Sequence, residues 1–170
     1  MKYNFLLLVC LLLFSCAPAE KKEEPQAIDA RSYNLGIIGA FGEIVNAGVK
    51  KLALSEALPP AEMDALMQDA QRVAQRNHVL LYRESSLIIT GLFPDDVAQG
   101  KEVLLIYQGT VKEEYLALKA EADSLQRAGA YSGNARADIS RRFGKMLSYP
   151  ARYINELMAA NGLDTVAANR

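Results

Sequence analysis

The helical spacing of apolar residues breaks at the stretch Val79-Leu80-Leu81-Tyr82-Arg83-Glu84-Ser85-Ser86-Leu87-Ile88-Ile89-Thr90. Its two apolar runs, 79–82 and 87–90, are short and β-favouring, and four polar residues separate them, a pattern that predicts a β-hairpin. A third strand is predicted over 102–107, after a loop over 93–100. We therefore expect a small, mostly antiparallel sheet of about three strands.

Helical patterns lie on both sides of these strands. Apolar residues at spacings of three and four predict helices over 35–58, 60–77, 111–128, 139–149 and 154–161. Ser32 is expected to cap the first helix, Pro60 to begin the second and Gly129 to end the third. Together these elements predict an α+β fold in which about five helices pack against the sheet.

The first sixteen residues bear on the location of the protein. Lys2 precedes an unbroken apolar run from Phe5 to Phe14, and Ser15 directly precedes Cys16. The run is shorter than the roughly 20 apolar residues that span a bilayer, so it fits the core of a signal peptide. The polar, proline-containing sequence after Cys16 argues against a helix that spans the membrane.

The arrangement Leu13-Phe14-Ser15-Cys16 resembles the lipobox of bacterial lipoprotein precursors, a resemblance that covers the leader and its cleavage point. It implies a signal peptide over 1–15, cleavage before Cys16 and a diacylglyceryl group on the Cys16 thiol. An ordinary secretory signal is the alternative. Acyl chains would anchor the protein durably, since each buried methylene contributes about 0.8 kcal/mol. Ala17, in place of the aspartate that retains lipoproteins in the inner membrane, favours the outer membrane, facing the periplasm.

The rest of the chain divides into three parts. Residues 16–31 predict a lipidated, flexible tether, 32–163 a single globular domain and 164–170 a frayed tail. The 20 acidic residues nearly balance the 19 Lys and Arg residues, so we expect no binding of nucleic acid. Because Cys10 would leave with the leader and Cys16 would be acylated, the mature chain would have no free thiol.

Few residues indicate catalytic chemistry. His78 is the only histidine, and its place at the end of a helical pattern indicates a role at the helix terminus. Because cysteine and histidine ligands are lacking, we expect no metal, and no cofactor other than the covalent lipid. Asp95 and Asp96 predict either a helix cap or, together with Arg83 and Glu84, a site for a small ligand or a hydrolytic reaction.

The C-terminal helices are locally basic, through Arg136, Arg141, Arg142 and Lys145. This pattern is typical of a solvated helix face, and it would also suit contact with anionic lipid headgroups or an acidic envelope polymer. A narrow apolar seam over 111–125 could also pair with a second copy of the chain.

The sequence therefore predicts a lipoprotein of the cell envelope that meets the membrane through its N-terminal lipid. We expect a binding or structural module rather than an enzyme, and its partner would be an envelope protein or a cell-wall component. The alternative is a ligand-binding or hydrolytic domain with its site at the loop that carries Asp95 and Asp96.

Overall fold

The computed structural model describes residues 29–163. This part of the chain folds into five helices and one three-stranded antiparallel sheet, which confirms the predicted α+β class. No helix within the described range is long and apolar enough to cross a membrane. The leader, Cys16, most of the tether and the tail over 164–170 lie outside the described residues, so their assignments stay predictions.

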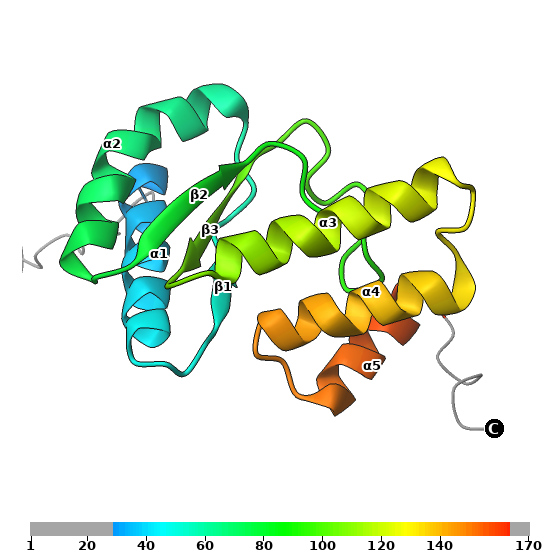
Figure 1. The fold of residues 1–170 in the computed structure, drawn as a ribbon. Helices are drawn as coiled ribbons and strands as arrows, with labels where there is room; N and C mark the ends of the chain where they lie inside the picture. Colours follow the sequence, from blue (N-terminus) through cyan, green and yellow to red (C-terminus); the bar gives the residue numbers. More distant parts are fainter. Residues whose placement is uncertain (1–28, 164–170) are drawn as a thin grey trace, which may run out of the picture.

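The sheet places its last strand in the middle. Its order is β1-β3-β2, with β1 at Leu52–Leu54, β2 at Leu80–Glu84 and β3 at Val103–Tyr107. All five residues of β3 are buried, because helices cover both faces of the sheet (Figure 1). An unbroken apolar strand is what burial on both faces requires. β1 and β2 are the two edge strands.

Five helices surround this sheet (Figure 1): α1 at Ala30–Asn46, α2 at Pro60–Arg76, α3 at Val111–Arg127, α4 at Gly133–Met146 and α5 at Ala151–Ala160. The side chains of a strand alternate between its faces, and β3 divides the core accordingly. Leu104 and Ile106 pack with α1 and α2. Leu105 and Tyr107 pack into a larger cluster with α3, α4 and α5.

The first helix differs from its prediction at both ends. Asp29, rather than Ser32, is the N-cap, and its carboxylate accepts a hydrogen bond from the Ser32 amide at 3.0 Å. Hydrogen bonds from Ser32 hold the pKa of the Asp29 carboxyl below its usual value. The helix ends at Asn46, not near residue 58, because Gly48 turns the chain at a φ of +73°. Leu52, which fits the helical spacing equally well, begins strand β1.

The predicted hairpin over 79–90 is wrong in its second half. β2 forms where the first run predicts it, but it pairs with β3 in the register Tyr82 to Leu105. Residues 87–90 belong to no strand. The sheet still has three strands because β1, which the helical pattern concealed, takes the remaining edge.

Other features of the helices follow the sequence more closely. His78 lies directly after Asn77, the C-cap of α2, in a left-handed conformation with φ at 54°. Its carbonyl oxygen accepts a hydrogen bond from Gln108 Nε2 at 2.8 Å. The apolar seam of α3 consists of Val111, Tyr115, Leu118 and Ala122. These side chains are buried in the core of this same chain, so the seam is not available to a second copy.

Two glycines provide a test of the packing between α4 and α5. A Cβ atom on Gly144 would lie 2.6 Å from Ile154 Cγ1, whereas one on Gly36 in α1 would meet no atom within 4 Å. Gly144→Ala is therefore expected to destabilise the protein by about 1–3 kcal/mol through overpacking. Gly36→Ala should stabilise it by up to about 1 kcal/mol through helix propensity. Urea denaturation measures both changes, and equal effects would contradict the packing described here.

Candidate functional site

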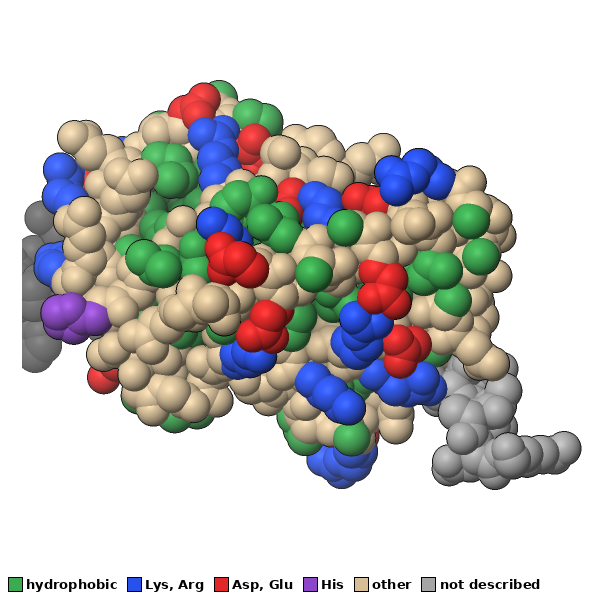
Figure 2. Space-filling view, in the orientation of Figure 1, with side chains coloured by type: hydrophobic (Ala, Val, Ile, Leu, Met, Phe, Trp, Pro, Cys, Tyr) green, Lys and Arg blue, Asp and Glu red, His purple; other side chains and the backbone are tan. Residues whose placement is uncertain are grey.

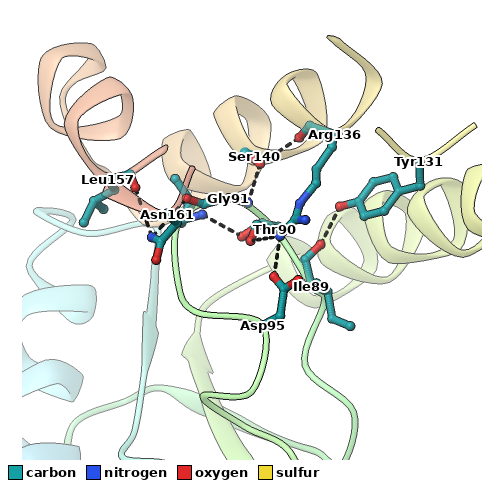
Figure 3. Close-up of polar contacts among 10 residues, drawn as sticks. Ile89, Thr90, Gly91, Asp95, Tyr131, Arg136, Ser140, Leu157 and Asn161 are labelled. Atoms are coloured by element: carbon teal, nitrogen blue, oxygen red, sulfur yellow. Dashed lines mark hydrogen bonds and ion pairs between the residues drawn. The ribbon is translucent and has the colours of Figure 1, made fainter. Parts of the chain in front are cut away.

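Residues 85–92 pass beside α3, α4 and α5 without a partner strand among the described residues, and Ile88 and residues 90–92 are buried. Side chains of the helices take the place of that strand. The Tyr115 hydroxyl accepts a hydrogen bond from the Ile88 amide at 3.2 Å. The Tyr131 hydroxyl donates to the carbonyl of Ile89 (Figure 3). Backbone groups that leave water need such partners, so these contacts permit an extended segment inside the fold.

Helices α4 and α5 complete the set of partners (Figure 3). Ser140 is fully buried, and its hydroxyl accepts from the Gly91 amide at 2.8 Å while it donates to the Arg136 carbonyl at 2.7 Å. The guanidinium of Arg136 donates to the carbonyl of Thr90 at 3.0 Å. Asn161 Nδ2 donates to the carbonyl of Gly91 at 3.2 Å. Each of these donors and acceptors is a polar side chain turned toward the segment.

A buried ion pair fixes the start of this segment. Glu84 is only 2% exposed, and its Oε1 accepts from Lys119 Nζ at 2.7 Å and from the Ser86 amide at 2.8 Å. Lys119 also donates to the carbonyl of Ser86. Burial, followed by the charge of Glu84, raises the pKa of the Tyr115 hydroxyl well above its usual value. The sheet, α3 and the segment are therefore joined through one polar cluster.

The four candidate ligand-binding residues do not meet in one place. Arg83 donates to Glu102 at 2.7 Å and to Asp64, near the start of α2, at 2.6 Å. Glu84 faces Lys119, as described above. Asp95 forms an ion pair with Arg136. The ligand-binding role assigned to these residues stays a prediction, but the convergence that it relied on is not present.

The four candidate basic residues also divide. Arg136 pairs with Asp95, and Arg142 pairs with Glu121 at 2.8 Å. Arg141 is half-buried and Lys145 is exposed. In Figure 2, acidic side chains lie among the basic ones at the lower right of the molecule. This face therefore carries mixed charge rather than a continuous positive patch.

Asp95 and Asp96 do line a hollow within the loop over 85–100. The hollow has a volume of about 470 Å³, and the two limbs of the loop surround it. Asp96 is exposed, in a turn rather than at the start of a helix, so the predicted helix cap is wrong. Within residues 29–163, no three His, Cys, Asp or Glu side chains are grouped closely enough to hold a metal ion.

A second concavity lies beside the edge strand β1, and we call it the β1 groove. It has a volume of about 560 Å³. Residues 53–57 form one side, the segment 93–101 forms another, and Phe41 of α1 with the turn over 147–149 complete it. Most of these side chains are apolar, and within residues 29–163 no strand pairs with β1 on this side. The site therefore combines an apolar surface with an unpaired sheet edge.

Two lysines lie on the walls of the β1 groove. Lys50 Nζ donates to the Leu147 carbonyl at 2.6 Å and lies 4.7 Å from the centre of the Tyr149 ring. Partial burial lowers the pKa of Lys50. Lys101 is exposed. Among the described residues neither lysine forms an ion pair, and Glu56 is the one carboxylate on the groove wall, so the groove carries a net positive charge.

Comparison with protein-family models, curated proteins and solved structures gives no match to this chain. The site must therefore be judged on its geometry. Sequence reasoning missed the β1 groove because it placed Leu52 and Leu54 in a helix. Gly48, followed by Lys50 and Lys51, was the signal that a turn ends that helix.

Substitution of Ser140 tests whether the side chains that hydrogen-bond to residues 85–92 stabilise the fold. Ser140→Ala leaves the buried Gly91 amide without its acceptor, which is expected to cost about 1–3 kcal/mol of unfolding free energy. Urea denaturation measures the change. The matched control is Ser124→Ala on the exposed side of α3, for which we expect less than about 0.5 kcal/mol. A Ser140→Ala protein as stable as the wild type would contradict this role.

Burial of the Tyr131 hydroxyl predicts that the free energy of unfolding decreases at alkaline pH. Burial raises its pKa from 10.0 to about 12, so the folded protein holds this proton more tightly than the unfolded chain. The contribution is fully present below pH 10 and is lost as the pH rises toward about 12. Urea midpoints across this window should fall less steeply for Tyr131→Phe than for the wild type. Tyr33→Phe, at a tyrosine that is 51% exposed, is the control and should leave the slope unchanged.

Proposed function

We propose that this chain is a lipid-anchored protein of the bacterial cell envelope whose domain binds a partner protein in the β1 groove. The observation that carries the binding role is the groove itself, because it places apolar side chains beside an unpaired strand edge. Surfaces of this kind are the usual sites of protein association. The lipobox-like residues 13–16 support the anchor.

The observations favour the β1 groove over the other candidate surfaces. In the loop hollow, Asp95 is already engaged by Arg136, and neither Arg83 nor Glu84 reaches the hollow. On the basic face, Glu121 and Asp138 compensate Arg142. The groove, in contrast, has an edge strand on one side and two lysines, Lys50 and Lys101, without carboxylate partners among the described residues.

The anchor and the groove support one another as parts of a binding module. Acylation at Cys16 would confine the domain to the membrane surface. Confinement raises the effective concentration of a partner that is held at the same surface, so a groove of modest affinity would suffice. The proposal therefore concerns an association between two envelope components rather than turnover of a substrate.

Site-specific cross-linking in intact cells of the native host tests the proposal. A photoreactive residue at Ala57 or Val97 lies on a groove wall, and one at Gln71 on the exposed side of α2 is the control. We expect one partner protein to be cross-linked from both groove positions and not from Gln71. Cys16→Ala should abolish that product, because the domain would leave the membrane.

Two results would overturn the proposal. One is a set of products that is the same from the groove and from Gln71, since the contacts would then be non-specific. The other is mass spectrometry that finds Cys16 unmodified in protein from the native host, since the anchor would then be absent.

A further inference from the structure

The register of the sheet shows which peptide groups of β1 are free. Ala53 pairs with Ile106 and Leu54 with Leu105. The Ser55 amide donates to the carbonyl of Leu104 at 3.0 Å. In an antiparallel ladder, alternate residues direct their N–H and C=O groups toward the partner. Ala53 and Ser55 therefore face β3, and the peptide groups of Leu54 face away from the sheet, on the side of the β1 groove.

Ser55 ends regular pairing without closing the edge. Its hydroxyl accepts from the Leu104 amide at 2.8 Å and donates to the carbonyl of Glu56 at 2.8 Å. Pairing with β3 resumes at Leu58, which exchanges two backbone hydrogen bonds with Glu102. The side chain of Ser55 thus stands in for a backbone acceptor, and residues 55–57 line the groove without regular secondary structure.

We propose that the β1 groove binds an extended acidic peptide of the partner, which adds a fourth strand to the sheet at the free edge of β1. This inference rests on the proposed function and names the kind of partner segment. Strand addition uses backbone hydrogen bonds for affinity and alternate side-chain pockets for specificity. The peptide groups of Leu54 would form the backbone hydrogen bonds, and the apolar walls beside Lys50 and Lys101 would form the side-chain pockets.

Charge decides the chemistry of the peptide. Lys50 and Lys101 have no carboxylate partner among the described residues, and Glu56 is the one acid on the groove wall. The Lys50 ammonium donates to the Leu147 carbonyl, which leaves its charge uncompensated. Alternate side chains of a bound strand point into the groove and out of it. A segment in which Val, Ile or Leu alternates with Asp or Glu would therefore place its apolar side chains on the walls and its carboxylates within reach of the lysines.

A peptide array tests the inference with the full chain, purified in detergent and labelled. The array holds peptides in which Val, Ile or Leu alternates with Asp or Glu. Two matched sets hold the same positions with Lys or Arg in place of the acids, and the same composition in blocks instead of alternation. We expect binding to the alternating acidic set, about tenfold tighter than to the basic set. Lys101→Glu should reduce or reverse that preference.

N-methylation of the best peptide, one amide at a time, tests the geometry. Added strands direct alternate amides at the sheet, so affinity should fall about tenfold at every second position and change little between them. Leu54→Pro removes the outward amide of β1 and should weaken binding similarly, because an edge position tolerates proline where its N–H faces away from the sheet. The N-methyl scan remains decisive if this variant does not fold.

The outcomes separate this inference from the proposed function. Equal binding to all three sets, an N-methyl scan without a period of two, or association of the chain with itself through Leu54 would overturn the strand addition. If the cross-links from Ala57 and Val97 nevertheless identify a partner, the proposed function stands with a different bound segment. If those cross-links also fail, both are wrong.

Discussion

A buried peptide group must find a hydrogen-bond partner, and residues 87–92 find theirs outside the sheet. Tyr115 and Tyr131, from α3 and the loop after it, reach the start of this segment, and Ser140 and Asn161 reach its end. Each contact ties a different element to one extended stretch of backbone. The positions of α3, α4 and α5 are thus coupled through this segment as well as through their apolar contacts.

The same segment creates the candidate site. After Leu92 the chain turns outward, and residues 93–101 return to the sheet as one side of the β1 groove before they enter β3. Leu87 and Phe93 line both the loop hollow and the groove, so the loop forms the boundary between the two concavities. The shape of the groove therefore depends on the polar contacts that hold the loop to α4, including Arg136 with Asp95.

The free edge of β1 is short, and shortness is one way in which proteins limit unwanted pairing of strands. β1 has three residues, and Lys50 and Lys51 directly precede it. Lys51 is paired with Glu114, so the charge beside the edge comes from Lys50. Repulsion between Lys50 and its copy in a second chain would oppose self-association, while a segment of opposite charge would be favoured.

Strands β2 and β3 and the five helices could be predicted from the sequence because periodicity reports local burial. The run over 103–107 is apolar throughout, which burial on both faces requires, and Pro60 and Gly129 mark helix ends through their own backbone preferences. The candidate site could not be predicted in the same way. Arg83, Glu84 and Asp95 are close in the sequence, yet each is drawn to a different long-range partner: Asp64, Lys119 and Arg136.

The sequence by itself determined the order and type of most elements, while the lipoprotein-like leader around Cys16 stays a prediction. Only the tertiary structure decided which apolar runs became strands. The run over 87–90 favours β-structure as strongly as β2 does, but side chains from distant helices satisfied its backbone and removed the need for a strand partner. Leu52–Leu54 took the vacant edge of β3, because hydrogen bonding between strands depends on what lies beside a segment in space rather than along the chain.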